Sequence, residues 1–177
     1  MQRVSVVGVP GSGKSTTGRM LASVLDAPFT ELDALFHQPG WTPLPPEQFR
    51  AAVAEVVAGD TWVVDGNYRQ VRDLVWDRAD TVLWLDPSRI RATSRVLRRT
   101  LERVTRGEEL WNGNSETWSN LFSADPERNV VLWSWKKHPE YRRSYTAAMV
   151  ERAHSDARWV RLRSADEVDV FLGGLER

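Results

Sequence analysis

A glycine-rich loop near the N-terminus carries the clearest chemical signal in the sequence. Residues 8–15 read Gly-Val-Pro-Gly-Ser-Gly-Lys-Ser, which matches the pattern Gly-x-x-x-x-Gly-Lys-Ser at every fixed position. Glycines let successive backbone N–H groups point at phosphate oxygens, and the helix expected after the loop directs its positive end at the same anion. The pattern therefore predicts a binding site for a nucleoside triphosphate.

Each residue of this loop has an expected task. We expect Lys14 to reach the β- and γ-phosphates, and the Ser15 hydroxyl to bind Mg²⁺. The residues expected to contact the triphosphate are Gly8, Pro10, Gly11, Ser12, Gly13, Lys14, Ser15 and Thr16.

Two acidic residues follow short apolar segments and are expected to complete the site. Asp65 follows residues 61–64, and an acid in that place typically orients Mg²⁺, although an Asp-Gly pair also forms turns. Asp33 follows residues 29–32. It is expected to be a base for an acceptor hydroxyl, a residue that contacts the ligands of the magnesium ion, or a helix or turn cap. Because parallel strands end at one sheet edge, both acids are expected near Lys14.

A long helix predicted for residues 88–106 is rich in arginine. Its seven arginines are Arg89, Arg91, Arg95, Arg98, Arg99, Arg103 and Arg106. A solvated basic face explains most of them, and the functional alternatives are a nucleic-acid patch or a clamp on a transferring phosphoryl group. We predict that two or three arginines form such a clamp. The candidates are Arg98, Arg99 and Arg142.

Nine tryptophans are a high number for 177 residues. Most are expected in the core or at interfaces, which large aromatic side chains dominate. Trp41, Trp111 and Trp118 fall in predicted loops and are candidates for an aromatic pocket around a substrate ring.

The elements that must position these residues alternate along the chain. Short apolar segments predict strands at 4–8, 29–32, 61–64, 81–85 and 158–162. Helices are predicted at 14–25, 46–58, 71–76, 88–106, 126–137, 140–153 and 165–175. This alternation predicts an α/β fold, with a parallel sheet covered by helices on both faces, in one domain spanning 1–177.

Bulk properties exclude several classes of protein. The 24 Lys and Arg residues balance 24 Asp and Glu residues, so no global attraction to nucleic acid or membranes is expected. The absence of cysteine excludes disulfides and thiolate metal sites, and no apolar run is long enough to span a membrane. We expect no signal peptide and a cytoplasmic location. His37, His138 and His154 lack metal-ligand spacing and are expected at the surface or in loops.

These motifs resemble the adenylate-kinase-like P-loop kinases. They are most similar to the bacterial group called DNA topology modulation proteins, which is also assigned as adenylate kinases. The matching segments are 8–15, 32–36, 39–41, 62–68 and 79–86. The resemblance covers residues 2–106 well and the remainder loosely. Its most specific part is the Asp-Gly-Asn-Tyr stretch at 65–68, after a strand that begins with tryptophan.

The resemblance implies a three-layer P-loop fold whose five-stranded parallel sheet has the order 2-3-1-4-5. It implies ATP with Mg²⁺ as the phosphoryl donor and a mobile helical lid at about residues 107–137. The segment 65–69 also aligns with the Asp-Gly-Phe-Pro-Arg motif of adenylate kinases, so Arg69 is expected to hold an acceptor phosphate.

The acceptor side differs from that of adenylate kinases. Where those enzymes carry a Thr-Gly-Asp-Met-Leu-Arg-like stretch, residues 33–41 contain no arginine, which speaks against AMP as the acceptor. An acid after the second strand is instead similar to shikimate and gluconate kinases, whose acceptor is a hydroxyl. We therefore expect a kinase for a small molecule or a nucleotide. The residues expected to bind the acceptor are Asp33, Trp41, Asp65 and Arg69.

The alternative is a regulatory ATP-binding protein or ATPase that contacts DNA through the arginine-rich helix. The zero net charge argues mildly against it, and steeply salt-dependent binding to duplex DNA would distinguish the two. The kinase hypothesis predicts ATP and a small acceptor as partners, without nucleic acid or membrane, and a monomer or homodimer.

Overall fold

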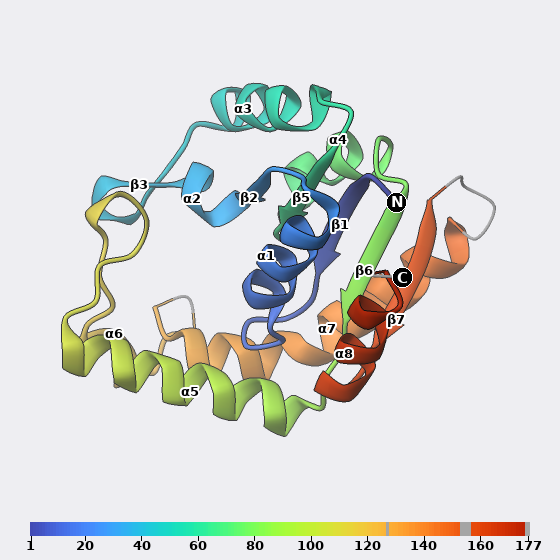
Figure 1. The fold of residues 1–177 in the computed structure, drawn as a ribbon. Helices are drawn as coiled ribbons and strands as arrows, with labels where there is room; N and C mark the ends of the chain where they lie inside the picture. The colour runs from blue at the N-terminus through green and yellow to red at the C-terminus, as the bar shows by residue number, and fades with distance from the viewer. Residues whose placement is uncertain (127, 153–156, 176–177) are drawn as a thin grey trace.

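Figure 1 shows the computed structural model, which describes residues 1–126, 128–152 and 157–175. The five strands of the main sheet are β1 (Arg3–Val7), β2 (Phe29–Glu31), β5 (Trp62–Asp65), β6 (Thr81–Leu85) and β7 (Arg158–Leu162). They are all parallel, and their order is β2-β5-β1-β6-β7. Counting only these five strands along the chain, the order reads 2-3-1-4-5. The labels differ because β3 (His37–Gln38) and β4 (Thr42–Pro43) form a separate antiparallel ribbon.

Helices cover both faces of the sheet, so the predicted three-layer α/β arrangement is present (Figure 1). One face carries α1 (Lys14–Leu25) and α8 (Ala165–Gly173). The other carries α3 (Pro46–Ala58), α4 (Arg72–Trp76) and α7 (Val130–Glu151). The long helix α5 (Arg89–Arg106) packs along α7. Shorter elements are the helices α2 (Leu32–Phe36) and α6 (Trp118–Leu121) and the 3-10 turns η1 (Pro39–Trp41), η2 (Arg69–Val71) and η3 (Trp111–Gly113).

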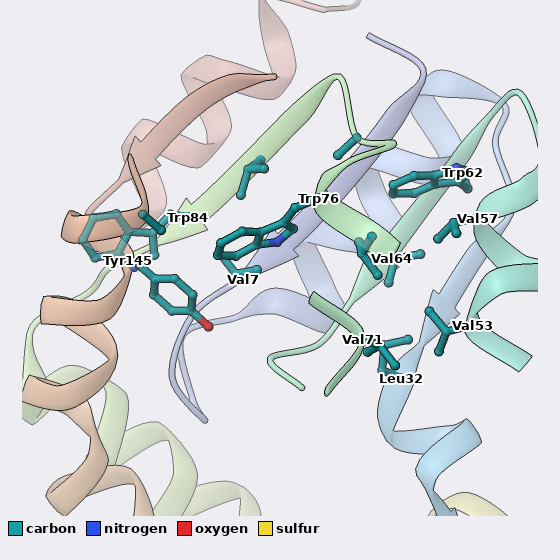
Figure 2. Packing of buried hydrophobic residues seen from close by; sticks show 14 of the residues in the cluster. Val7, Leu32, Val53, Val57, Trp62, Val64, Val71, Trp76, Trp84 and Tyr145 are labelled. Atoms are coloured by element: carbon teal, nitrogen blue, oxygen red, sulfur yellow. The ribbon is translucent and has the colours of Figure 1, made fainter. Parts of the chain in front are cut away.

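Two apolar layers follow from the alternation of side chains along each strand. In β5, Val63 faces the layer under α1 and α8, whereas Val64 faces the layer under α3, α4 and α7 (Figure 2). The second layer also buries Trp62, Trp76 and Trp84. Large aromatic side chains thus fill the core on this face, as expected from the sequence.

The helix α7 differs from the prediction. We predict two helices at 126–137 and 140–153, but the structure has one helix that passes through Pro139. A proline inside a helix removes one hydrogen bond and tends to kink it. Here Ser134 and Tyr145, on either side of the proline, are fully buried, so tertiary packing stabilises the helix on both sides of Pro139. The last residue of the second predicted helix lies outside the described residues.

We predict a loop at residues 37–46, but the structure has the β3–β4 ribbon and η1 there, and α2 lies directly before it. The segment 107–129, after α5, extends to this ribbon, where η3 contacts β3, η1 and α2 (Figure 1). The predicted end of the lid, residue 137, lies inside α7. Among the helices of the described residues, we find none with the length and apolar character needed to cross a membrane.

Candidate active site

The glycine-rich loop joins β1 to α1 at the carboxyl edge of the sheet. Gly13 is the N-cap of α1, and the Thr17 N–H donates to the Gly13 carbonyl at 2.9 Å. The N–H groups of the helical residues before Thr17 have no partner within the helix, so they can donate to a phosphate. Lys14 Nζ donates to the Val9 carbonyl at 3.3 Å, which keeps the ammonium group beside the loop.

Gly11 shows why this loop requires glycine. Its φ is +79°, and a Cβ there would lie 2.2 Å from the Ala92 carbonyl oxygen of α5. The left-handed backbone and the close approach of α5 both disfavour a side chain. The first turn of α5 therefore packs directly against the loop. A Cβ at Gly13 would lie 3.8 Å from Arg95 Nη1, so Arg95 also reaches the loop.

Ser15 and Asp65 meet beside the loop, as the magnesium prediction requires. The Ser15 hydroxyl donates to Asp65 Oδ2 at 2.6 Å, and Asp65 is only 5% exposed. Burial raises the pKa of Asp65, whereas Lys14 and the Ser15 hydroxyl oppose that rise. Asp65 Oδ1 is buried with no hydrogen-bond partner among the described residues. A buried carboxylate oxygen without a donor is suited to a cation, so the pair fits Mg²⁺.

Further ligands for such a cation would have to come from phosphate oxygens and water. The described residues contain no cluster of three or more His, Asp or Glu side chains that could hold a metal ion by themselves. This composition is typical of Mg²⁺, which keeps several waters and binds together with substrate phosphates.

Asp33 lies in the first turn of α2, within a network of polar side chains. Tyr68 donates its hydroxyl hydrogen to Asp33 Oδ1 at 2.6 Å, and His37 Nε2 lies 3.3 Å from the Tyr68 oxygen. Burial, followed by the charge of Asp33, raises the pKa of Tyr68, so the phenol remains a donor. Burial lowers the pKa of His37 despite the opposing charge of Asp33, which favours a neutral imidazole.

The histidine prediction needs correction. His37 is half-buried and belongs to the site instead of the bulk surface. His138 is buried within α7, and its Nε2 lies 2.9 Å from the Pro87 carbonyl oxygen. His154 lies outside the described residues. Histidines adjacent to elements that pack together are buried by tertiary contacts, which spacing along the sequence does not reveal.

Two of the three candidate tryptophans lie near Asp33. The rings of Trp41 and Trp111 both pack on His37, with centroid distances of 5.2 Å and 6.1 Å. Trp111 Nε1 also donates to Glu31 Oε2 at 3.0 Å. Trp118, the third candidate, is 47% exposed on α6.

The predicted arginine clamp is only partly assembled. Burial and the charge of Arg103 lower the pKa of Arg99, whereas the charges of Glu116, Asp33 and Asp65 oppose this lowering. The side chain of Arg98 is 78% exposed and pairs with Glu102 instead. Because neighbouring residues of a helix point about 100° apart, the two arginines cannot share one direction. The prediction for Arg98 is therefore not supported by its placement.

Neither Arg142 nor Arg69 forms an ion pair with Asp33 or Asp65 among the described residues, so their roles rest on the sequence. Arg142 Nε is 3.2 Å from the buried Asp86 carboxylate, which also pairs with Arg161. This ion pair engages Arg142 within the protein, and its predicted contact with a phosphoryl group remains a prediction. Arg69 is exposed at the start of η2, directly after Tyr68, and its acceptor role also remains a prediction.

Asn67 is a site residue that the sequence reasoning missed. Its carboxamide accepts from the Gly8 N–H at 3.2 Å and donates to the Gly8 carbonyl, while the Tyr145 hydroxyl donates to its Oδ1 at 2.7 Å. These contacts tie the loop after β5 to the phosphate-binding loop. The signal was present, because Asn67 and Tyr68 belong to the most specific stretch of the sequence, but no spacing rule predicts these contacts.

Comparison with known sequences finds one match to a protein family. The family model for shikimate kinase matches residues 10–41, which hold most of the phosphate-binding loop, α1 and Asp33. No curated protein matches the chain.

Solved structures align with nearly the whole chain. A gluconokinase from Sinorhizobium meliloti 1021 is 22% identical with a TM-score of 0.53, covering 98% of this chain and 91% of its own. A shikimate kinase from Bacteroides thetaiotaomicron is 14% identical with a TM-score of 0.54, covering 99% and 96%. A shikimate kinase from Acinetobacter baumannii, in complex with shikimate, is 17% identical with a TM-score of 0.56, covering 99% and 92%.

At these identities the likeness concerns the fold alone, which the chain shares with the gluconokinase and the two shikimate kinases. The match of residues 10–41 to the shikimate kinase family model, which includes most of the phosphate-binding loop, supports a kinase, that is, a phosphotransferase, as the class of enzyme.

Proposed function

We propose that this chain is an ATP-dependent kinase that transfers the γ-phosphoryl group to a hydroxyl group of a small molecule. The observation that carries the proposal is the placement of two carboxylates at one edge of the sheet. Asp65 is hydrogen-bonded to Ser15 beside the phosphate-binding loop, and Asp33 lies close enough in α2 for its charge to raise the pKa of Asp65, after burial as the main cause. The first carboxylate suits the donor and the second suits the acceptor.

The donor half provides the groups that a triphosphate needs. The free N–H groups at the start of α1 and the Lys14 ammonium group bind phosphate oxygens. Ser15 and Asp65 would hold Mg²⁺, which when bound neutralises charge on the β- and γ-phosphates. Arg99, whose pKa responds to the charges of Asp33 and Asp65, is the arginine that we propose to stabilise the charge of the transferring group.

The acceptor half provides a base and an aromatic wall. Asp33 accepts the proton of the acceptor hydroxyl as its oxygen attacks the γ-phosphorus. Trp41 packs on His37 next to this carboxylate and forms an apolar surface for the acceptor. Arg69, which is exposed at the start of η2, is the proposed binding group for a charged substituent of the acceptor.

The segment 107–129 is the proposed lid. Asn114 is 3% exposed, donates to the Gln38 carbonyl at 3.0 Å, and accepts from the Trp41 N–H at 2.8 Å. These bonds dock the segment on the β3–β4 ribbon, beside Asp33. A lid in this place excludes water, which would otherwise accept the phosphoryl group.

The placement of the arginines gives no specific support to the DNA-contacting alternative. The same holds for the finer resemblance to DNA topology modulation proteins. The Arg89 guanidinium lies 3.8 Å from the centre of the Trp135 ring, and Arg103 lies 3.4 Å from Glu116. Such contacts engage part of the basic helix within the protein.

The proposal is tested by a phosphoryl-transfer screen with ATP and Mg²⁺ against nucleoside monophosphates, nucleosides and hydroxyl metabolites such as shikimate and gluconate. We expect transfer to a hydroxyl compound, and we expect Lys14→Ala to abolish it while circular dichroism shows a folded protein. Lys136→Ala is the matched control, because Lys136 is exposed on α7. Turnover retained by Lys14→Ala rejects the kinase assignment, and transfer only to a monophosphate rejects the hydroxyl acceptor.

A further inference from the structure

We propose that Tyr68 is a positioning residue that directs Asp33 toward the acceptor hydroxyl, and that Asn67 sets the place of Tyr68 relative to the bound triphosphate. This inference rests on the proposed kinase function and adds two residues to it. Both act through other groups, Tyr68 through the Asp33 carboxylate and Asn67 through the phosphate-binding loop.

Asn67 is fixed by three hydrogen bonds. Its amide nitrogen donates to the Gly8 carbonyl at 2.5 Å, and its oxygen accepts from the Gly8 N–H at 3.2 Å and from the Tyr145 hydroxyl at 2.7 Å. Tyr145 is fully buried in α7, and this burial raises its pKa, so it stays a donor. Both ends of the carboxamide are thereby used, which leaves the side chain one orientation.

Tyr68 follows directly and connects this fixed point to the acceptor side. Its 2.6 Å hydrogen bond to Asp33 Oδ1 is short, as expected for a donor to a carboxylate. Asp33 Oδ2 accepts no hydrogen bond from the described residues. It is also absent from the fully buried polar atoms that lack a partner, so this oxygen is not closed off by the protein. With Oδ1 occupied, a proton that reaches Asp33 must go to Oδ2.

His37 supports this arrangement from behind. The Tyr68 hydroxyl has one hydrogen, which goes to Asp33, so the His37 Nε2 facing its oxygen at 3.3 Å must carry a hydrogen and donate. A neutral imidazole with hydrogen on Nε2 leaves Nδ1 as an acceptor, and Nδ1 is buried without a partner among the described residues. Trp41 and Trp111 pack against the ring and hold it in place.

The ionisable groups around Asp33 come from several elements. They are His37 after α2, Tyr68 after β5, Asp65 at the end of β5, Arg99 on α5 and Tyr141 on α7. Arg99 carries the opposite charge and Asp65 the same charge, and both stay in place when the Tyr68 hydroxyl is removed. Removal of the hydroxyl changes two of the described contacts, the hydrogen bond to Asp33 Oδ1 and the contact of the Tyr68 oxygen with His37 Nε2.

The transfer step balances with these residues. The acceptor O–H bond breaks and its proton moves to Asp33 Oδ2, while the acceptor oxygen forms a bond to the γ-phosphorus. The bond from the γ-phosphorus to the bridging oxygen breaks, and ADP leaves with the electron pair. Tyr68 keeps its own hydrogen on the bond to Oδ1 throughout, and therefore positions the base without exchanging a proton.

Tyr68→Phe removes one oxygen and keeps the ring that packs on Phe36 and Phe49. With ATP, Mg²⁺ and the best acceptor of the screen, or water where none reacts, we expect kcat to fall about 10- to 100-fold. ATP affinity should stay within about twofold. The acidic limb of the kcat–pH profile should move to higher pH, since the Asp33 anion loses a hydrogen bond.

Tyr141→Phe is the matched control, because the Tyr141 hydroxyl makes no hydrogen bond that the described residues show, and it should leave kcat and the pH profile unchanged. Asn67→Ala should weaken both ATP affinity and kcat, since it removes the hydrogen bonds that join Asn67 to Gly8 of the phosphate-binding loop. Unchanged kcat and pH profile in Tyr68→Phe overturn the inference, as does loss of ATP binding in that variant. Turnover by Lys14→Ala would instead reject the kinase function itself.

A second pair of variants covers the case in which Tyr68→Phe does not fold. His37→Phe removes the donor behind Tyr68 and should lower kcat several-fold with the same displacement of the acidic limb. His37→Gln keeps an N–H donor and should retain most of kcat. Equal activity of these two variants contradicts the proposed arrangement, and thermal melting of each protein shows whether it is folded.

Discussion

The proposed donor half of the site is built mainly from backbone groups, whereas the proposed acceptor half is built from side chains. The donor half consists mainly of backbone, namely the N–H groups of one loop and the first turn of α1. The acceptor half consists of side chains that come from separate segments, with Asp33 from α2, Tyr68 from the loop after β5 and Trp111 from the segment after α5. A backbone site is specified by a local motif, whereas a side-chain site depends on tertiary contacts. The fold can therefore retain its donor while its acceptor varies.

The sharpest way to break this comparison is to place the same substitution in both halves. Gly11 and Gly40 have similar φ values of +79° and +72°, but a Cβ at Gly11 meets the Ala92 carbonyl at 2.2 Å, whereas a Cβ at Gly40 meets nothing within 4 Å. Gly11→Ala should therefore weaken ATP binding at least about 100-fold, because the loop must move away from α5. Calorimetric titration with ATP and Mg²⁺ measures this.

Gly40→Ala is the control for backbone strain alone. It should cost about 1–2 kcal/mol of stability, which thermal unfolding measures, and leave ATP affinity unchanged. Equal losses of ATP affinity in the two variants would show that the close approach of α5 does not shape the donor loop.

A smaller effect is expected where the lid meets the acceptor half. Asn114→Ala removes hydrogen bonds to Gln38 and Trp41 in a buried place, which should weaken the docking of segment 107–129 by about 1–3 kcal/mol. The KM for the acceptor should rise about tenfold or more, while ATP affinity stays the same. Steady-state kinetics with each substrate varied in turn separates these effects.

Asn120→Ala is the matched control for this change. Asn120 lies on the same segment, and among the described residues its side chain accepts hydrogen bonds from Thr117 and Ser119. It should leave both kinetic constants unchanged. A fall in ATP affinity for Asn114→Ala would mean that the two halves are not separable.

The smallest predicted effect concerns the ion pair between Arg50 of α3 and Asp73 of α4. The hydrogen bond from Arg50 lowers the pKa of Asp73 to about 2, below the value of about 3.9 for an unfolded chain. The stabilisation is therefore full above about pH 4 and is lost as the pH falls through about 2. Asp73→Asn should lower Tm by at most a few degrees at pH 6, since the pair is exposed. This difference should narrow below pH 4, as melting curves would show.

Asp60→Asn gives the same chemical change at an exposed position and is the matched control for the melting curves. If the Tm difference for Asp73→Asn stays constant down to pH 2.5, the pair does not contribute as described.

Local patterns predicted most of the fold and the donor half. The strands near Val4, Val63 and Val82 are mostly apolar because both faces of the sheet are covered, and such runs are visible in the sequence. The meeting of Ser15 with Asp65 also followed, since parallel strands end at one edge. These predictions needed only short-range information and the rule that strands alternate with helices.

The acceptor half could not be predicted to the same degree. His37 was expected at the surface, yet it joins Tyr68 and the two tryptophans through contacts between distant segments. Arg98 was preferred together with Arg99, but the exact direction of each side chain depends on how α5 is rotated against α7. The segment around Pro139 was predicted to separate two helices, because the packing that stabilises one continuous helix there cannot be read from the sequence.

The contact between Gly11 and Ala92 has a mechanical consequence. The helix α5, which leads into the proposed lid, touches the phosphate-binding loop at its first turn. This contact would be the pivot about which α5 rotates, with the segment after Arg106 at the distant end of the helix. With a rise of about 1.5 Å per residue, Arg95 lies close to the pivot and Arg103 about three turns of helix from Ala92. A small rotation of α5 would therefore move Arg103 and the lid much further than Arg95. Motion of the lid would thus leave the grip on the triphosphate nearly constant while it opens and closes the way to Asp33.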